Sequence, residues 1–297
     1  MGISKKTVLL TGGTGFLGSN LLKRLILEDY KIILLIRPSS NTWRLHDIIK
    51  DVVLYTPDGS SFDKLFQSEH IDIIIHCATN YGRGAIDPSV LLEANLILPL
   101  KLLQSGNKNG VSCFINTDTV LDKGVNYYSL SKDQFKEWLK VYSHEMACIN
   151  IALEHFYGPF DDKSKFVSFI IDNLLNNVDN LDLTEGRQKR DFIYIDDVVD
   201  AFVKIIQNID SHDKGYFHYE IGTSCTIEIR EFATLVKRLS HNARTFLNFG
   251  SLPYRRNEVM ESHVDVSAIR KLGWAPKYSI EEGLRKTIQL EKEYKGR

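Results

Sequence analysis

The sequence predicts an α/β protein built on a doubly wound parallel sheet, and three observations carry this prediction. Apolar runs of strand length alternate with apolar residues at helical spacing along the first half of the chain, which is typical of βαβ units. The runs are almost continuously apolar, as strands of a sheet covered on both faces are. Turn residues, above all glycines, separate the runs from the helical patterns.

The first unit of this pattern contains a glycine-rich turn, residues 11–18, between a strand-like run at 6–10 and a helical pattern. This geometry directs free amides at the start of a helix towards an anion. Gly12 would permit the tight turn, Gly15 a close approach to a pyrophosphate, and Gly18 close packing of helix on strand. A plain connection is the alternative, but the next strand follows at βαβ distance. We therefore expect a dinucleotide site.

The composition is that of a globular protein without a surface for nucleic acid or an anionic membrane. The 297 residues are 43% hydrophobic and 25% charged, and the net charge is −1. No apolar run approaches the length of a membrane span, and residues 1–6 leave no room for a signal peptide. The four cysteines lie far apart without a Cys-x-x-Cys pair, so we expect reduced thiols, no metal site and a cytoplasmic location.

The end of the second strand, residues 31–36, bears on the choice of cofactor. An acidic residue there favours NAD, whereas an arginine favours the 2′-phosphate of NADP. Here the acid is missing and Arg37 is present, with Ser39, Ser40 and Arg44 nearby. We expect NADP(H) rather than NAD(H), and the alternative is that Arg37 is a solvated surface charge.

Further strands are expected at residues 51–55, 71–78 and 111–117, and a long helix at 88–107. The fourth strand ends in His76, which we interpret as a packing residue. The fifth strand delivers a polar segment, residues 117–119, to the sheet edge that carries the glycine turn, where ligands bind in such folds. A capping or turn role is the alternative for Asp118 and Thr119.

Tyr128 and Lys132 stand at positions i and i+4 of a predicted helix and therefore project from one face. A phenol normally titrates near pH 10, and an ammonium group beside it lowers its pKa. The pair thus predicts a general acid or base. Tyr127 has no lysine at that spacing and is the second choice.

With these motifs in place, the chain resembles the extended short-chain dehydrogenase/reductases, in particular the nucleotide-sugar epimerase/dehydratase branch. The matching motifs are residues 11–18, Asn95, Thr117, Tyr128 with Lys132, and the segments 157–159, 190–198 and 271–276. The resemblance implies an NADP-binding Rossmann domain, residues 1–155 with 191–222 returning to it. It also implies a smaller interleaved sugar-nucleotide-binding domain, residues 156–190 and 223–297.

The resemblance assigns contacts as well. Cofactor contacts are expected from Gly12, Thr14, Gly15, Phe16, Leu17, Gly18, Arg37, Ala78, Asn95, Tyr128 and Lys132. Substrate contacts are expected from Asn80, Tyr81, Asp118, Thr119, His155, Lys165, Phe166, Arg190, Arg255 and Arg256. Arg190 and one of the later two arginines would hold a diphosphate, because guanidinium groups bind phosphate oxygens bidentately. The alternatives are a surface ion pair of Arg190 with Asp191 or Glu185, and a core position for Phe166.

Within the branch, four segments are most similar to CDP-abequose synthase-like 4-ketoreductases of deoxysugar and O-antigen synthesis. These segments are residues 75–82, 115–119, 153–159 and 256–260. Asp118 is followed by Thr119, whereas the dehydratases have a glutamate there that serves as the base for elimination. The resemblance therefore implies NADPH-dependent reduction of the C4 ketone of a CDP- or dTDP-linked 6-deoxy-4-ketohexose. In this reaction Tyr128 protonates the alkoxide, Lys132 lowers the pKa of Tyr128 and binds the nicotinamide ribose, and Thr117 binds the carbonyl oxygen.

Two other functions stay open at this stage. A C4 epimerase would use the same triad with a tightly bound NAD, and Arg37 argues against it. A non-catalytic NADP-sensing protein would not need Tyr128 and Lys132 together. The family usually dimerises through the 88–107 helix and the Tyr128 helix, so a homodimer is expected.

Overall fold

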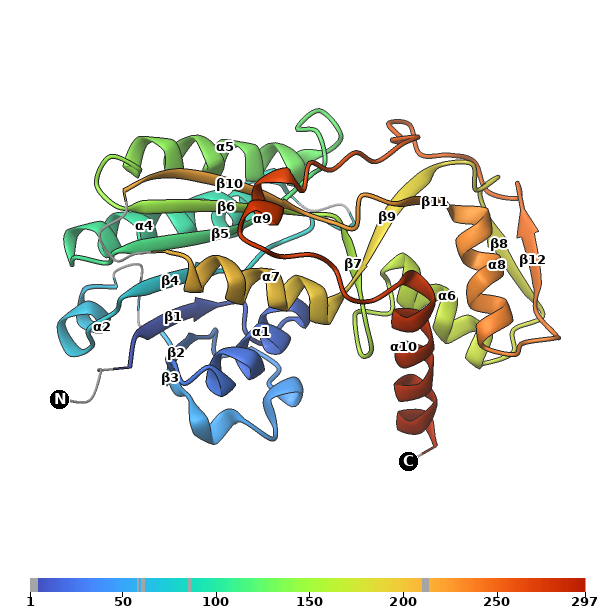
Figure 1. The fold of residues 1–297 in the computed structure, drawn as a ribbon, viewed down its shortest axis with the longest axis horizontal. Helices are drawn as coiled ribbons and strands as arrows, with labels where there is room; N and C mark the ends of the chain where they lie inside the picture. The colour runs from blue at the N-terminus through green and yellow to red at the C-terminus, as the bar shows by residue number, and fades with distance from the viewer. Residues whose placement is uncertain (1–4, 58, 60–61, 85–86, 210–213, 297) are drawn as a thin grey trace. The chain divides into compact units, whose positions relative to one another are not determined.

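The protein is described by a computed structural model that covers residues 5–57, 59, 62–84, 87–209 and 214–296 (Figure 1). The chain folds into two compact units. The first comprises the described parts of Met1–Leu153 and Ala201–Tyr219, and the second those of Glu154–Asp200 and Glu220–Arg297. Helix α7 (Ile195–Gln207) belongs to both units, because the boundary falls within it.

The first unit is built from seven strands and the helical segments between them. Its strands are β1 (Thr7–Thr11), β2 (Lys31–Leu35), β3 (Val53–Tyr55), β4 (Ile73–His76), β5 (Cys113–Thr119), β6 (Ala147–Leu153) and β10 (Gly215–Ile221). Its helical segments are α1 (Phe16–Leu27), η1 (Trp43–Leu45), η2 (Ile49–Asp51), α2 (Asp63–Ser68), α3 (Pro88–Leu92), η3 (Glu93–Ile97), α4 (Leu98–Lys108) and α5 (Tyr127–Tyr142).

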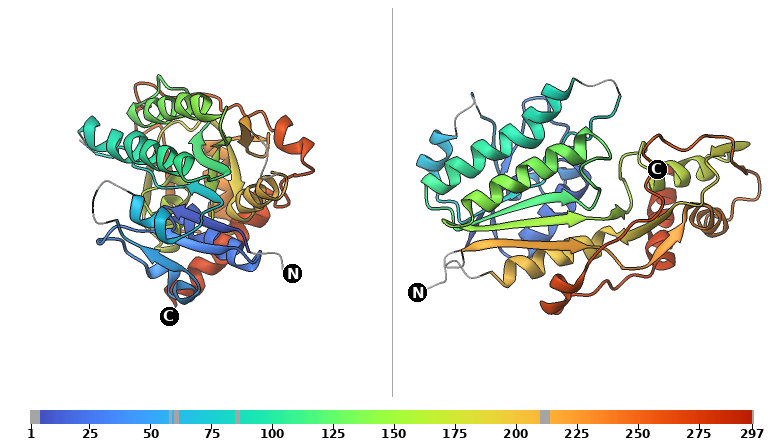
Figure 2. Two further views of the ribbon diagram at one scale, coloured as in Figure 1. Left: turned by 90° about the vertical axis from the view of Figure 1, so that its left-hand side faces the viewer. Right: turned by 90° about the horizontal axis from the view of Figure 1, so that it is seen from above.

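The strands of the first unit form one sheet in the order β10-β6-β5-β4-β1-β2-β3. Parallel pairing joins β1 to both β2 and β4, and β5 to both β4 and β6. Helices α4 and α5 lie side by side over one face, and α1 and α7 cover the other (Figures 1 and 2). The predicted doubly wound α/β fold is therefore confirmed.

The face under α4 and α5 carries a hydrophobic cluster of the first unit. Buried side chains of the sheet, such as Ile74 and Phe114, meet Leu102 of α4 and Phe135 of α5 in one hydrophobic cluster. The rings of Phe114 and Phe135 are 5.8 Å apart between centroids. Because side chains alternate along a strand, every second residue of β4, β5 and β6 faces these two helices.

The helix expected at residues 88–107 contains a π-helical turn, η3, between α3 and α4. Pro99 explains this difference, because it lacks an amide hydrogen and its ring would collide with the carbonyl of Asn95 in a regular α-helix. Asn95 lies inside the widened turn and is fully buried. The wider turn changes the direction in which its side chain projects.

The second unit contains two small sheets and four helices besides the shared α7. One sheet has the order β11 (Thr226–Glu228), β9 (Lys189–Tyr194), β7 (His155–Tyr157), and the other pairs β12 (Phe246–Phe249) with β8 (Asn180–Leu183). The helices are α6 (Phe166–Leu175), α8 (Ile229–Leu239), α9 (Ser267–Lys271) and α10 (Ile280–Lys295). The Phe192 and Phe232 rings stack at 4.1 Å between centroids and mark the core.

Two further observations concern the chain as a whole. No helix among the described residues is both long and apolar enough to cross a membrane. All four cysteines have free thiols. Cys113 and Cys148 are buried, whereas Cys225 is exposed.

Candidate active site

The glycine turn between β1 and α1 is tight at Gly12, as predicted, whereas Gly18 packs against the turn and not against the strand. Gly12 adopts a φ of +70°, and a Cβ there would overlap the backbone of Ala78. A Cβ at Gly18 would overlap Gly12, so this glycine packs against the turn itself. Gly15 is exposed and donates its amide to the Gly12 carbonyl at 2.9 Å. The turn therefore presents bare backbone to solvent at Gly15.

The other predicted cofactor residues of the turn contribute mainly backbone. Phe16 and Leu17 begin α1, and they are only 7% and 8% exposed. Their side chains are therefore buried, and we expect a ligand at this end of the helix to meet their backbone amides. Thr14 is half-buried. Ala78 donates its amide to the Thr11 hydroxyl at 3.2 Å, which ties the segment after β4 to the end of β1.

Arg37 follows β2 and its side chain is exposed. The Arg37 amide donates a hydrogen bond to the Ser40 hydroxyl at 3.0 Å, which closes a short turn after β2. The guanidinium of Arg44 lies over the Trp43 ring, 4.4 Å from its centroid. Two of the residues expected to assist Arg37 in binding the 2′-phosphate, Ser40 and Arg44, thus contact residues close to them in the sequence.

Four polar side chains, Thr11, His76, Asn116 and Asn150, form a polar row across β1, β4, β5 and β6 on the α5 side of the sheet. The strand register pairs each of them with the next. His76 Nδ1 lies 2.9 Å from the Thr11 hydroxyl, and Asn116 Nδ2 donates to Asn150 Oδ1 at 2.8 Å. In the middle, the buried His76 Nε2 and Asn116 Oδ1 have no hydrogen-bond partner among the described residues.

Tyr128 and Lys132 lie near the start of α5, which Asn126 and Ser129 begin with a reciprocal capping box. Lys132 is 1% exposed, and its Nζ has no hydrogen-bond partner in the described part of the chain. Tyr128 is half-buried. Its ring lies 5.2 Å from that of Tyr81 between centroids. The helix thus holds the predicted pair with the lysine amine unsatisfied.

The expected lowering of the Tyr128 pKa by Lys132 is not what the structure shows. Burial raises the pKa of the Tyr128 phenol well above its ordinary value, and Tyr81 and Asp118 raise it further. Burial also lowers the pKa of Lys132, against the opposing effect of Asp118. Desolvation disfavours the charged form of both groups, so it outweighs the attraction on which the prediction was based.

The three polar residues at the end of β5 are all engaged with protein. The Thr117 hydroxyl donates to the His76 carbonyl at 3.0 Å, so its one proton is not directed at a ligand as expected. Asp118 Oδ1 accepts the Thr119 amide at 2.8 Å, and the Thr119 hydroxyl accepts the Leu121 amide at 3.2 Å. The turn role, raised as the alternative for Asp118 and Thr119, is therefore observed.

Asn95 organises the loop after β4 through its side-chain amide. Its Oδ1 accepts the Asn80 amide at 2.7 Å, and its Nδ2 donates to the Asn80 carbonyl at 2.8 Å and to the Ser131 hydroxyl at 3.0 Å. Asn80 in turn accepts the Gly82 amide at 2.9 Å. These bonds of Asn95 join the loop carrying Tyr81 to α5, and its predicted cofactor contact stays a prediction.

In the second unit, Arg190 is buried rather than at the surface. It is 9% exposed, forms an ion pair with Glu258, and donates to the Lys189 carbonyl at 2.8 Å. The proposed partners Asp191 and Glu185 were wrong. Burial lowers the pKa of Arg190, and the nearby Arg255 adds to this effect. Arg255 and Arg256 are both exposed.

The remaining predicted substrate residues of the second unit also have protein partners. His155 Nδ1 lies 2.9 Å from the buried carboxylate of Glu154, which also accepts the Ser262 hydroxyl. Lys165 is 3.2 Å from Asp161. Phe166 contacts the aromatic core, with its ring 5.8 Å from that of Phe232 between centroids, so the core alternative describes it better.

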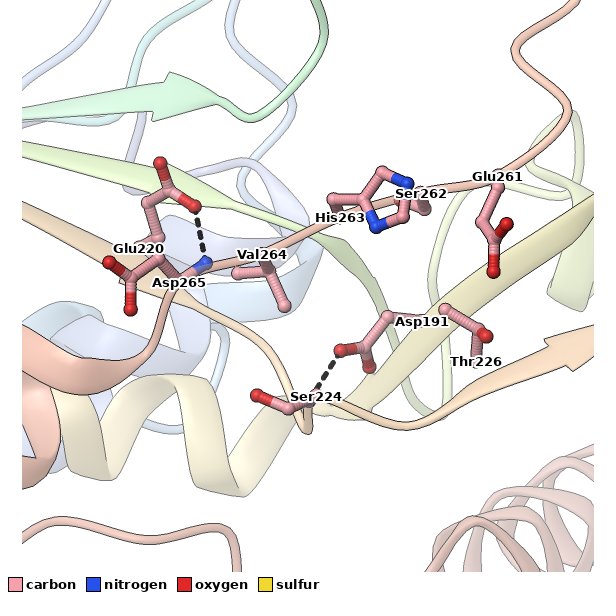
Figure 3. Close-up of a pocket in the computed structure, with 9 residues that line it drawn as sticks. All are labelled: Asp191, Glu220, Ser224, Thr226, Glu261, Ser262, His263, Val264 and Asp265. Atoms are coloured by element: carbon pink, nitrogen blue, oxygen red, sulfur yellow. Dashed lines mark hydrogen bonds between the residues drawn. The ribbon is translucent and has the colours of Figure 1, made fainter.

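A separate cavity of about 570 Å³ lies within the second unit and contains none of the predicted site residues (Figure 3). Its wall carries the carboxylates of Asp191, Glu220, Glu261 and Asp265. Asp191 accepts the Ser224 amide at 2.7 Å, and Glu220 accepts the Asp265 amide at 2.7 Å. This acidic lining would repel a phosphate, and no metal-binding cluster occurs among the described residues.

Sequence reasoning missed Asn150, which joins the polar row to Asp118 by donating to its Oδ2 at 2.7 Å. The available signal was an asparagine inside an otherwise apolar run, residues 147–153. It also missed the carboxylates of Glu154 and Glu258. No local pattern marks Glu258, because it lies 68 residues from its partner Arg190.

Two observations test whether a nicotinamide dinucleotide fits the first unit. No described side chain caps the start of α1, and Gly15 at its N-cap is exposed, so the first amides stay available to a pyrophosphate. The buried Lys132 amine has no described partner and would gain one from a ribose hydroxyl. The residues present therefore fit the cofactor.

Comparison with known proteins gives results of three kinds. The model of the NAD dependent epimerase/dehydratase family matches residues 8–222. The chain is 36% identical to a CDP-abequose synthase of Salmonella muenchen and 30% identical to one of Salmonella typhimurium, each alignment covering 96% of this chain and 98% of the relative. The solved structure of UDP-glucose 4-epimerase from Thermotoga maritima, with UDP-glucose, has a TM-score of 0.86 over 97% of this chain and 99% of that one at 23% identity, a likeness of fold.

Proposed function

The chain belongs to the NAD dependent epimerase/dehydratase family, and we propose that it is a 4-ketoreductase that uses NADPH. Its substrate is a nucleotide-linked 6-deoxy-4-ketohexose with CDP as the preferred nucleotide and dTDP as the second choice. The names of the relatives support CDP and a role in deoxysugar synthesis. Arg37, which stands just after β2 where NAD-binding proteins have an acidic residue, supports NADPH over NADH.

One structural observation carries the choice of reduction over elimination. Thr119 stands where the dehydratases of the family have a glutamate, and its hydroxyl accepts the Leu121 amide at 3.2 Å. It is therefore a turn residue with no basic group to remove a proton from the sugar. Tyr128 and Lys132 remain as the acid–base pair, which suffices for ketone reduction.

In the proposed reaction the C4 ketone gains a hydride and a proton and becomes an alcohol. When bound, NADPH supplies the hydride and is left as NADP⁺. Tyr128 donates the phenolic proton to the C4 oxygen as charge develops there, and solvent later returns it. Lys132 binds the nicotinamide ribose through its Nζ, which has no hydrogen-bond partner among the described residues. Thr117 donates a hydrogen bond to the C4 oxygen of the sugar once its hydroxyl has rotated away from the backbone carbonyl of His76.

Arg190 is the first choice for holding the diphosphate, and Arg255 rather than Arg256 is the second. Arg255 acts electrostatically on Arg190, so the two guanidinium groups form one positive region. Glu258 is paired with Arg190, so the diphosphate exchanges places with this carboxylate. We also propose a homodimer through α4 and α5, since Trp138 and Val141 of α5 are 42% and 61% exposed.

The test is an assay of NADPH consumption by the purified full-length protein with CDP-, dTDP- and GDP-linked 6-deoxy-4-ketohexoses, followed by NMR of the product. We expect turnover with the CDP-linked sugar, a slower reaction with NADH, and a new C4 alcohol. Tyr128→Phe is the inactive control. Silence with all three sugars from a protein purified with tightly held NAD would contradict the proposal and favour a C4 epimerase.

A further inference from the structure

Asp118 is a buried carboxylate in an orientation fixed by β6. It is 7% exposed, and its Oδ2 accepts from Asn150 Nδ2 at 2.7 Å. Asn150 is fully buried, and its Oδ1 accepts from Asn116 at 2.8 Å. Because this amide accepts on one side and donates on the other, turning it over would break both bonds. The carboxylate therefore cannot rotate without disturbing two strands.

The carboxylate lies on the side of the sheet that carries α5. Residues Phe114, Asn116 and Asp118 alternate along β5 and share one face. Phe114 packs on Phe135 of α5 at 5.8 Å between ring centroids. Lys132 precedes Phe135 by three positions and shares its helix face. Asp118 and the unpartnered Lys132 thus belong to one buried layer between sheet and helix.

The charged and titratable groups around Tyr128 come from several elements. Lys132 stands on the same helix, Asp118 on β5, and Tyr81 in the loop after β4. His76 and Cys77, at the end of β4, lie near Lys132. Three outer groups lie around Asp118. Lys136 of α5 and Tyr216 of β10 interact with it electrostatically, and His218 of β10 is joined to it through Asn150. In this set Asp118 opposes ionisation of Tyr128 and favours the charged form of Lys132.

We propose that Asp118 is a fixed negative charge, opposite to that of the Lys132 ammonium and like that of the Tyr128 phenolate, and that Asn150 is the positioning residue that holds it in place. The inference rests on the proposed function, because ketone reduction needs Tyr128 as a phenol that can donate its proton. Oxidation of an alcohol would instead begin with the phenolate. A carboxylate in the same buried layer favours the phenol. The polar row thus helps to keep Tyr128 in the protonated form from which reduction starts.

The experiment is a pH titration of the ligand-free, full-length protein with tyrosines carrying ¹³C at Cζ. The Tyr128 resonance is the one lost in Tyr128→Phe. We expect Asp118→Asn to move the Tyr128 titration to lower pH by about one unit. Asn150→Leu should move it in the same direction by less, since the carboxylate stays but loses its anchor. The matched control is Thr11→Val, which removes a buried hydroxyl of the same row that bonds to His76 and Ala78 and to neither Asn150 nor Asp118, and should leave the titration unchanged.

Two outcomes would overturn the inference. If Asp118 merely contacts substrate, Asp118→Asn raises KM and leaves the Tyr128 titration where it was. If the row is merely structural, all three variants lower the melting temperature and none moves the titration. Asp118→Ser, which removes the same charge and keeps an oxygen, replaces Asp118→Asn if that variant does not fold. Because the titration needs no turnover, failure of the reductase assay and failure of this inference are read separately.

Discussion

The two units of the molecule differ in how far the protein has already satisfied the groups expected to bind ligand. In the first unit, Lys132 is buried with no hydrogen-bond partner among the described residues. In the second unit, Arg190 and Lys165 are already paired with carboxylates, those of Glu258 and Asp161. A ligand of the first unit therefore supplies a missing partner, whereas a ligand of the second unit has to replace a partner that is present.

This difference shows that residue type and availability are separate properties. Both lysines, Lys132 and Lys165, were expected from the same family resemblance and carry the same charge. Lys132 is desolvated with no hydrogen-bond partner among the described residues, which disfavours its charged form. Lys165 lies 4.6 Å from the Phe156 ring centroid and 3.2 Å from the Asp161 carboxylate, so its amine already has partners. Replacing each residue separately should therefore have different consequences.

The largest expected effect belongs to the first unit. Tyr128→Phe should reduce the rate of ketone reduction about 10²- to 10⁴-fold, because it removes a general acid. Tyr127→Phe is the matched control, since Tyr127 is the neighbouring residue and is 66% exposed, and it should retain the wild-type rate. The measurement is NADPH consumption, with cofactor binding and melting temperature checked in both variants. Equal activity of the two variants would remove Tyr128 from its assigned role.

The next effect compares the two lysines through stability, and the signs should be opposite. Lys132→Met should raise the free energy of unfolding by about 1–2 kcal/mol, because methionine fills the space without burying an amine that lacks a partner. Lys165→Met should lower it by about 1–2 kcal/mol, because it weakens the compensation of the buried Asp161 carboxylate. Urea unfolding of the free protein measures both. A change of the same sign in both variants would show that the two sites are not different in this respect.

A smaller effect concerns the arginines of the second unit. Arg190→Gln should weaken binding of CDP about tenfold, or about 1.4 kcal/mol, because a charge-assisted contact with phosphate is lost. Arg255→Gln should weaken it less, and Arg256→Gln should leave it unchanged. Titration calorimetry with CDP measures all three. If Arg256→Gln had the largest effect, the diphosphate region would have to be redrawn around that residue.

The smallest expected effect is a pH dependence of the free energy of unfolding that arises from the buried Lys132 amine. Folding lowers the pKa of Lys132 through burial, so over the range between its folded pKa and its ordinary value the folded chain binds fewer protons than the unfolded one. The free energy of unfolding therefore rises with pH over that range. The stability advantage of Lys132→Met should shrink as the pH increases. Unfolding curves of both proteins at several alkaline pH values test this, and a constant difference would contradict it.

Local patterns predicted the sheet and the positions of the chemical groups well, because strand ends, glycines and helical spacing are local features. The glycine turn, the end of β5 and the α5 pair were all located in this way. The partners of these groups were not predictable, because Glu258 and Glu154 come together with theirs only in the folded chain. Asn150 was missed since no strand was predicted for residues 147–153, the run that contains it.

The direction of the Tyr128 pKa shift was also out of reach of the sequence. The i and i+4 spacing shows that Tyr128 and Lys132 share a helix face, but it does not show how deeply that face is buried. The structure places the face against a closely packed sheet, where desolvation exceeds the attraction between neighbours. By contrast, the π-helical turn has a local signal, Pro99, that a closer reading of the 88–107 helix would have used.

The order of the strands also has a consequence for the newly made chain. Strand β6 lies between β5 and β10 in the sheet, yet residues 154–200, which belong to the other unit, are synthesised between β6 and β10. Until Gly215–Ile221 has left the ribosome, the edge of β6 therefore has no strand to pair with. An unpaired edge is a template for association with other chains. A nascent chain halted before residue 215 would carry this edge unpaired in its sheet.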